Sequence, residues 1–235
     1  MYSIESIKKM VSLMNETICK YSAVDVNDIK LCISSGNRKI GRVMNVSLPP
    51  VMTCTNCSEC KRFCYDIKAC LQYPNTVIDA RIRNYVVLMK SRELYFEKIE
   101  NAISSRRKNK FFRWHVAGDI VDLDYFSRMV EAARLHADFK FWTYTKNYKV
   151  VNEYCRKYGR KNIPDNFSVM FSEWDGMPID NPYGFPVFSV KMQAGNKNHQ
   201  EAYFDGLYKC PGNCDVCKEN GRGCIAGENV YCDEH

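Results

Sequence analysis

A run of closely spaced cysteines is the feature of the sequence most able to do chemistry. Its members are Cys54, Cys57, Cys60 and Cys64, in the pattern C-x2-C-x2-C-x3-C. This is the spacing of bacterial ferredoxin-type [4Fe–4S] sites, although Tyr65 stands where a proline usually follows the last cysteine. Zinc favours C-x2-C pairs separated by a longer spacer, so the run predicts iron–sulfur ligation. In this spacing the fourth cysteine commonly serves another cluster, which leaves open whether Cys64 shares a metal with the other three.

Residues 201–235 contain a second group of cysteines. They are Cys210, Cys214, Cys217, Cys224 and Cys232, and the first three are spaced C-x3-C-x2-C. Intervening glycines allow the backbone to pass close to an inorganic core. Thiolates bind both iron and zinc, so the pattern predicts a second metal site at Cys210, Cys214, Cys217 and Cys224. A second [4Fe–4S] cluster and a zinc ion both remain open as its occupant, and no ligand role is assigned to Cys70 or Cys232.

The composition places these thiols in a folded protein. The chain has 235 residues, of which 46% are hydrophobic and 26% charged, which excludes disorder and collagen-like structure. No apolar stretch is long enough to span a bilayer, and the first residues lack the apolar core of a secretion signal, so we expect a cytoplasmic protein without membrane contact. Thirteen cysteines in a reducing compartment indicate metal binding or catalysis.

Charge suggests a second class of partner. The net charge is +7, but residues 201–235 carry −4 and the remaining residues +11. The densest basic run is residues 104–110. A surface of this kind can attract nucleic acid, and it is also typical of a solvated loop between elements, so the sequence leaves both interpretations open.

Hydrophobic periodicity predicts the elements that precede and follow the first cysteine run. Residues 4–20 have helical spacing with Ser3 available as a cap, and residues 29–47 form two extended runs joined by a turn. Residues 74–103 have helical spacing again and predict one long helix or two.

Beyond residue 110 the predicted elements alternate. Strands are expected at 111–118, 139–145, 167–172 and 187–190, with helices at 123–135 and 150–158 between them. Such alternation specifies parallel crossovers. We therefore predict an α/β fold: a partial (β/α) barrel of mostly parallel strands over residues 1–200, with the cysteine-rich residues 201–235 packed on it as a metal-binding tail.

Polar residues gather where these strands end. They are Arg113, His115, Gly118, Asp119, Lys146 and Glu173. The carboxyl ends of parallel strands open on one face, so we expect these residues to share a site. Strand alternation places Arg113 and His115 on one side of their strand, pointing into the interior of the sheet. The alternatives are a structural ion pair for Arg113 and a satisfied core histidine for His115.

Several segments together resemble the phage gene product 88-like family. They are residues 36–40, 48–50, 54–65, 113–119 and 144–146, with the cysteine tail. The resemblance covers most of the chain from residue 36 onward. It implies a virus- or prophage-encoded protein and does not imply an activity.

A second resemblance is to the architecture of radical S-adenosylmethionine enzymes. These place a cluster-binding loop after the first strand of a partial barrel, as the loop at 54–64 would here. The resemblance implies that Gly118 and Asp119 form the turn whose acid binds the amino group of the cofactor. Glu173, at the end of another strand, is a further candidate for cofactor binding. Those enzymes use C-x3-C-x2-C in this loop, whereas here Cys60-x3-Cys64 is followed by Ile67 at the third position. The departure leaves open whether one iron remains free for S-adenosylmethionine.

The sequence thus predicts an iron–sulfur protein that carries out one-electron chemistry. Asp119, His115, Arg113 and Lys146 are its candidate catalytic residues. Its expected partners are a small-molecule or macromolecular substrate and an electron donor. The alternative is a non-enzymatic phage accessory protein whose structural metal sites, iron–sulfur or zinc, support binding to nucleic acid or a host factor.

Overall fold

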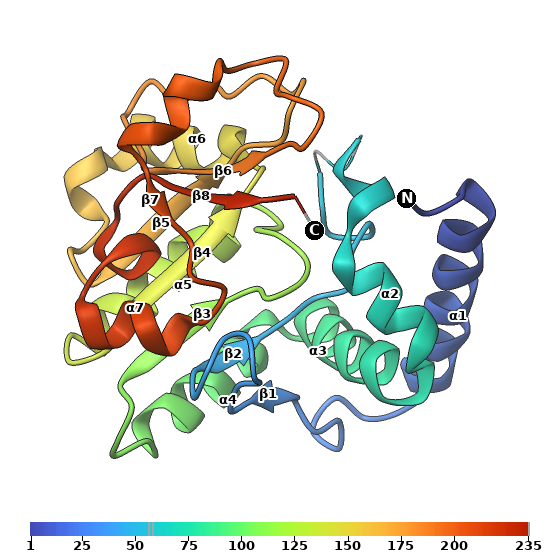
Figure 1. Ribbon diagram of the computed structural model, residues 1–235. Helices are drawn as coiled ribbons and strands as arrows, with labels where there is room; N and C mark the ends of the chain where they lie inside the picture. Colours follow the sequence, from blue (N-terminus) through green and yellow to red (C-terminus); the bar gives the residue numbers. More distant parts are fainter. Residues whose placement is uncertain (56, 58, 235) are drawn as a thin grey trace.

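Eight strands form one sheet in the computed structural model, which describes residues 1–55, 57 and 59–234. The strands are β1 (Ile33–Ser34), β2 (Met44–Val46), β3 (Phe111–Trp114), β4 (Lys140–Thr145), β5 (Phe167–Ser172), β6 (Val187–Lys191), β7 (Tyr208–Lys209) and β8 (Val230–Asp233). Their order is β1-β2-β3-β4-β5-β6-β8-β7, and only β1 runs antiparallel to its neighbour (Figure 1). The sheet of the described residues is not closed. The α/β class with mostly parallel strands is confirmed.

Seven α-helices accompany the sheet in the described part of the chain. They are α1 (Ile4–Ser22), α2 (Tyr65–Gln72), α3 (Asp79–Lys90), α4 (Arg92–Ser104), α5 (Leu123–Leu135), α6 (Tyr148–Tyr158) and α7 (Cys214–Asn220). Ser3 caps α1 as predicted, accepting a hydrogen bond from the Ser6 backbone amide. The periodic segment 74–103 forms two α-helices because Ser91 leaves the helical conformation and caps α4. A π-helical turn, Pro74–Ile78, precedes α3.

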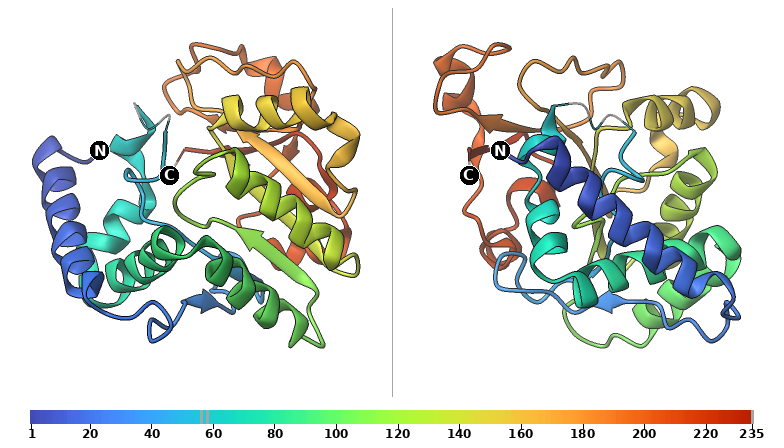
Figure 2. Two further views of the ribbon diagram at one scale, coloured as in Figure 1. Left: turned by 180° about the vertical axis from the view of Figure 1, so that it is seen from behind. Right: turned by 90° about the vertical axis from the view of Figure 1, so that its right-hand side faces the viewer.

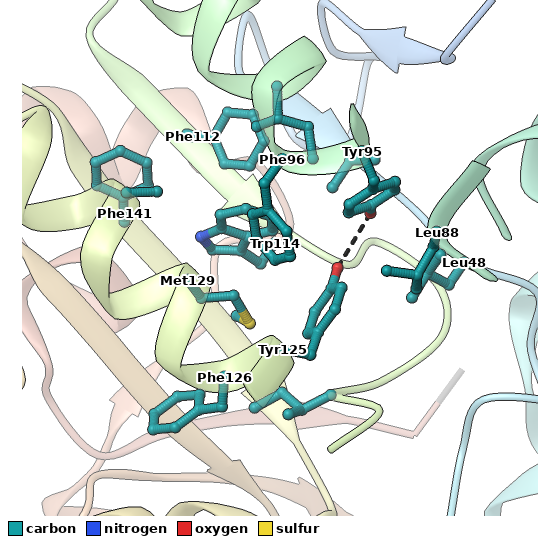
Figure 3. Packing of buried hydrophobic residues seen from close by; sticks show 14 of the residues in the cluster. Leu48, Leu88, Tyr95, Phe96, Phe112, Trp114, Tyr125, Phe126, Met129 and Phe141 are labelled. Carbon is teal, nitrogen blue, oxygen red and sulfur yellow. Dashed lines mark hydrogen bonds between the residues drawn. The ribbon is translucent and has the colours of Figure 1, made fainter. Parts of the chain in front are cut away.

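Helices α5 and α6 cover one face of the sheet, which we call the outer face (Figure 2). Alternate residues of the strands point toward these helices. Phe112, Trp114 and Phe141 are fully buried there against α4 and α5 (Figure 3). Aromatic contacts dominate this core, since the Phe112 and Trp114 rings lie 4.9 Å apart and Phe96 lies 5.8 Å from Trp114.

The opposite, inner face of the sheet is covered by the cysteine tail. Helix α7 lies beside β3, and the helical turn Gly223–Ala226 lies over β4 and β5, on the side away from α5 (Figure 1). Trp142 points inward, whereas its neighbour Phe141 points outward, as strand alternation requires. Trp142 packs with Val43, Met170 and Cys224 in a separate core. The sheet is therefore buried on both faces, as is usual for parallel strands.

The N-terminal helices form a flank that supports the first cysteine run. Helix α1 packs on α2 and α3, burying Met10 and Met14. An ion pair of 3.1 Å joins Asp66 of α2 to Arg81 of α3. No helix in the described part of the chain has the length and apolar character needed to cross a membrane.

The tail contributes β7 and β8 to the main sheet, and the sequence did not predict either strand. Strand β8 lies between β6 and β7 and pairs in parallel with both. These strands are two and four residues long. Segments this short contain too few residues for an alternating pattern to be recognised.

Candidate functional site

The first cysteine run and the predicted polar residues meet at the carboxyl ends of the parallel strands. The chain leaving β2 stays beside the chain leaving β3, because the Leu48 amide donates to the Ala117 carbonyl over 2.9 Å. The loop then brings Cys60 next to Asp119 and Lys146, close enough for both charges to act on its thiol. The strands thus position the loop as expected for an α/β site.

Three thiols of the run contact one another. The Cys57 thiol is hydrogen-bonded to the thiols of Cys54 and Cys60, and these contacts raise the pKa of Cys57. The Cys57 contact and the Lys146 ammonium lower the pKa of Cys60 to about 7. All thirteen cysteines are free, so no disulfide competes for these sulfurs.

The fourth cysteine of the run lies in a different environment. Cys64 immediately precedes α2, and burial raises the pKa of its thiol to about 11. Cys70, which lies within α2, is fully buried, and its thiol sulfur lies 3.8 Å from the Asp66 carboxylate. Cys64 is thus in a more buried environment, although it still lies near enough to Cys54 for that thiol to raise its pKa as well.

The thiol contacts at Cys57 are pairwise, and the cysteine sulfurs do not surround a common point where a metal ion could sit. Within residues 1–55, 57 and 59–234, no group of three or more His, Cys, Asp or Glu side chains is arranged so that it could hold a metal ion. The predicted metal role of both cysteine groups accordingly remains a prediction.

Asp119 is the most fully organised polar group at this edge. It is buried, and burial raises the pKa of its carboxyl group. Its Oδ1 accepts hydrogen bonds from the Thr145 hydroxyl at 2.5 Å and the Ile120 amide at 2.7 Å, while its Oδ2 accepts from the Lys146 amide at 2.9 Å. A carboxylate offers about four acceptor positions, so one remains on Oδ2.

Glycine is required immediately before Asp119. Gly118 has a φ of +83°, and a Cβ at this position would lie 2.7 Å from the Leu48 Cβ and 2.9 Å from its carbonyl oxygen. Both the backbone conformation and the close approach of the two loops exclude a side chain. Gly118 therefore lets Asp119 sit directly above the end of β3, next to the cysteine loop.

A second polar network follows β5 and β6. Lys146 donates to the Ser172 hydroxyl over 2.7 Å. The buried Glu173 accepts a hydrogen bond from Ser189 at 2.6 Å and lies 2.7 Å from Nε2 of His199. The His199 ring stacks on Tyr203, with ring centroids 3.6 Å apart.

Sequence reasoning missed His199. It lies in an irregular loop 26 residues beyond Glu173, where no periodicity connects the two positions. The available signal was weak: His199 is one of only four histidines in the chain. The three-dimensional path of the loop, which the sequence pattern does not specify, brings it to the site.

A cavity of about 680 Å³ borders the thiols on the side formed by the loop after β5. Cys54, Cys57 and Val51 line one wall, and Gly176, Met177 and Pro178 line the other. Val51 has a φ of +68°, a conformation that a β-branched residue rarely adopts. Strained backbone of this kind concentrates at ligand sites, and the cavity volume falls in the range of small-molecule sites.

The prediction that Arg113 and His115 share a face is wrong. Strand β3 ends at Trp114, and His115 has a φ of +57°, which turns its side chain to the outer face. There its Nε2 lies 2.9 Å from the Tyr125 hydroxyl, and burial lowers the pKa of His115 to about 3. Arg113 alone points inward, where its guanidinium lies 4.6 Å from the centre of the Tyr144 ring.

The tail cysteines gather on the inner face, beneath β3 and β4 rather than in the cysteine loop. Cys210, Cys214 and Cys224 pack with the inner-face core, and Cys217 is buried next to Gly223. The structure thus separates the two predicted cysteine groups into two environments on the same sheet.

A protein-family model matches a large part of the chain. The model of the family described as gene product 88 matches residues 25–181, which include the cysteine loop, Asp119, Lys146 and Glu173 but not the tail cysteines. No curated protein and no solved structure matches the chain. Because the matched region spans more than half of the sequence, the chain belongs to the gene product 88 family.

Proposed function

We propose that this chain is an iron–sulfur enzyme whose Cys54, Cys57 and Cys60 thiolates bind a [4Fe–4S] cluster. The observation that carries the proposal is the contact of the Cys57 thiol with both of the others, beside Asp119 and Lys146. Soft thiolates in a C-x2-C-x2-C loop are the donors that such clusters require. Because the thiols meet only in pairs, the proposal requires Cys54 and Cys60 to close around Cys57 when iron and sulfide bind.

Three thiolates leave one iron of such a cluster without a protein ligand. We propose that S-adenosylmethionine is the ligand there, bound to the iron that the three thiolates leave open. The bound cluster would supply one electron to that ligand.

The neighbouring side chains have distinct tasks in this proposal. Asp119 has a vacant acceptor position on Oδ2 and would hold the ammonium group of the ligand. Lys146, fixed by Ser172, would place a positive charge beside the cysteine loop, and Glu173 would accept hydrogen bonds from ligand hydroxyl groups. The cavity at Cys54 and Cys57 gives a small substrate access to the thiols.

Anaerobic reconstitution tests the proposal. The full chain is treated with iron and sulfide, and its visible spectrum, iron and sulfide content, and reductive release of 5′-deoxyadenosine are measured. We expect a brown protein that cleaves S-adenosylmethionine. Replacing Cys57 with serine should remove the iron of the N-terminal cluster, because an oxygen ligand cannot replace the central thiolate. The rate of S-adenosylmethionine cleavage should then fall at least 100-fold.

Cys19→Ser is the matched control, because Cys19 is an exposed cysteine of α1. It should retain both iron and cleavage. A colourless wild-type protein without iron would refute the iron–sulfur proposal. A brown wild-type protein that releases no 5′-deoxyadenosine would refute only the enzymatic half.

A second candidate function is favoured by the position of the tail. We propose that its cysteines form a structural metal site, because Cys210, Cys214 and Cys224 pack in the apolar core between the tail and the sheet. A closed thiolate site of zinc or iron would fasten the tail onto the inner face. Removing the metal with a chelator should then lower the melting temperature without abolishing the N-terminal cluster.

A further inference from the structure

The amino-terminal ends of the parallel strands form the edge of the sheet opposite the cysteine loop. Three loops enter strands there: residues 36–42 before β2, residues 105–110 before β3 and residues 136–140 before β4 (Figure 1). We call this surface the basic edge, because its loops carry many more lysine and arginine residues than carboxylates. The cations are Arg38, Lys39, Arg42, Arg106, Arg107, Lys108, Lys110 and Lys140, and the carboxylate within the loops is Asp138.

The strand pairing brings these loops together. Lys140 pairs with Phe111, and its amide donates a hydrogen bond to the Lys110 carbonyl over 2.8 Å. Arg42 and Lys110 each lie two residues before paired positions of β2 and β3, so they enter neighbouring strands next to each other. The chain thus places cations that are far apart in the sequence in a row across three adjacent strands.

The loop before β2 is held by its own side chains and by the tail. Oδ1 of Asn37 accepts a hydrogen bond from the Lys39 amide at 2.9 Å. The Lys39 carbonyl accepts another from the Cys214 amide over 3.2 Å, and the Arg42 amide donates to the Asp215 carboxylate. A backbone that is fixed before binding loses less freedom when a ligand binds. The tail therefore holds part of the basic edge in place.

Little negative charge opposes these cations. Among the described residues, Lys110 alone of the basic edge has a carboxylate within 4.0 Å, that of Asp138 at 2.9 Å. A second carboxylate, Asp215 of α7, is paired with Lys218, and Arg42 also interacts with it electrostatically. Cations gathered in this way create a positive potential that attracts a polyanion. The exposed members are Arg38, Lys39, Arg42, Arg107, Lys108 and Lys140.

We propose that the basic edge binds the phosphate backbone of a nucleic-acid duplex. Adjacent strands lie about 4.8 Å apart, so a row across three strands is about 10 Å wide. A DNA duplex carries one phosphate charge for about every 1.7 Å of its axis, and the row therefore faces several phosphates at once. Such contacts supply affinity without reading the base sequence. The inference goes beyond the proposed iron–sulfur function and does not depend on it.

The apolar residues of the three loops favour a duplex over other polyanions. Single strands bind largely through bases that stack on exposed aromatic rings. Phe139 is buried, and Phe111, which follows the loops, lies beneath the Lys218 ammonium, 5.3 Å from its ring centre. Membrane-surface binding combines basic residues with large exposed apolar ones. Ile40 and Phe139, the large apolar residues of these loops, are both buried.

Binding to a short DNA duplex of arbitrary sequence tests the inference. The full-length chain is titrated into the labelled duplex, and fluorescence anisotropy is recorded at several salt concentrations. The affinity should fall linearly with salt on logarithmic scales, with a slope of about −4 or steeper, because each phosphate contact contributes about −0.9. Replacing Arg106, Arg107 and Lys108 together with glutamine should weaken binding at least tenfold and make the slope shallower by about 2 to 3.

A variant with the same change of net charge elsewhere is the matched control. Lys8, Lys9 and Lys20 are exposed on α1, which lies away from the basic edge (Figure 1). Replacing all three with glutamine should leave the affinity within about threefold of the wild type, because only the overall field of the protein changes. The double variant Arg106→Lys and Arg107→Lys keeps the charge and should retain the salt slope. Thermal unfolding of each variant verifies that the fold is unchanged.

Several results would overturn the inference. One is a wild-type chain that does not bind the duplex at low salt. Another is an α1 variant that loses as much affinity as the loop variant, which would indicate attraction by net charge alone. Tighter binding to a single strand of the same length, or to phosphatidylserine vesicles, would also contradict it. Cys57→Ser should bind the duplex as the wild type does, so the iron–sulfur proposal and this one fail separately.

Discussion

The two cysteine groups of this protein differ more in their surroundings than in their spacing. The N-terminal loop, residues 54–64, lies at the open end of the sheet among Asp119, Lys146 and a cavity. The tail cysteines lie on the inner face against Trp142, Met170 and Val43. Similar sequence motifs are thus placed in a polar, accessible setting and in an apolar, covered one.

The proposals above assign separate tasks to the two groups: a ligand site for the thiols beside fixed polar groups, and a structural role for the tail, where Cys217 and Cys224 are buried. The supports differ in the same way. Polar contacts such as Asp66–Arg81 hold the loop region, and aromatic packing holds the tail. Perturbing each kind of support separately tests this comparison.

The largest effect is expected from Trp142→Ala on the tail side. Trp142 is fully buried, and truncating a buried aromatic residue costs about 3–5 kcal/mol. Urea unfolding measures the loss. Trp174→Ala is the control at the open end, where Trp174 is partly exposed and contacts Phe63, and it should cost about 1 kcal/mol. Equal losses would show that the tail packs no more tightly than the loop region.

The next effect concerns the ionic support of the loop region. Arg81→Met leaves the carboxylate of Asp66 buried without its partner, and we expect a loss of about 3 kcal/mol in unfolding free energy. Adding Asp66→Asn should recover part of this loss, because the stranded charge is then removed. The double-mutant cycle gives the coupling between the two positions. A coupling near zero would mean that this ion pair does not support the loop.

A smaller, pH-dependent effect is expected from His115 on the outer face. Its folded-state pKa of about 3 lies below the ordinary histidine value of 6.5, so the unfolded chain binds a proton that the folded chain does not. The contribution of His115 to the free energy of unfolding is fully present above pH 6.5 and is lost as the pH falls toward 3. Between pH 6.5 and 5 the loss amounts to about 2 kcal/mol.

His115→Gln should remove this contribution. Urea unfolding at several pH values would show a flatter stability profile than that of the wild type over this interval. His136→Gln is the control, because His136 ends α5 near the surface and should leave the profile unchanged. Parallel profiles for wild type and His115→Gln would show that His115 is not held neutral by burial.

Much of the fold could be predicted from periodicity alone. The strands around Phe112, Phe141 and Val169 and the helices between them follow local patterns of two and 3.6 residues, and they form as expected. The break at Ser91 and the strands of the tail could not be predicted with the same certainty. The helix break depends on the conformation of the single residue Ser91, and the tail strands depend on pairing between short segments that are distant in the sequence.

The site was predictable where it follows the rule that polar residues gather at strand ends. Asp119, Lys146 and Glu173 obey this rule. His115 does not, because one left-handed residue at the end of β3 reverses the side on which its ring lies. His199 reaches Glu173 through a loop whose path depends on tertiary contacts. A left-handed backbone conformation at one residue and a contact between residues distant in the sequence are thus the features of the site that the sequence pattern could not predict.

The position of β8 between β6 and β7 constrains the order in which the tail can assemble. Strand β7 precedes β8 in the chain but has no pairing partner until β8 is present. Pairing of β7 therefore requires the parallel crossover of β7, α7 and β8, and this unit joins the rest of the sheet through β6. Because Trp142 and Met170 pack against Cys224 and Val230 of this unit, a chain in which the tail detached would expose large apolar side chains and become prone to aggregation.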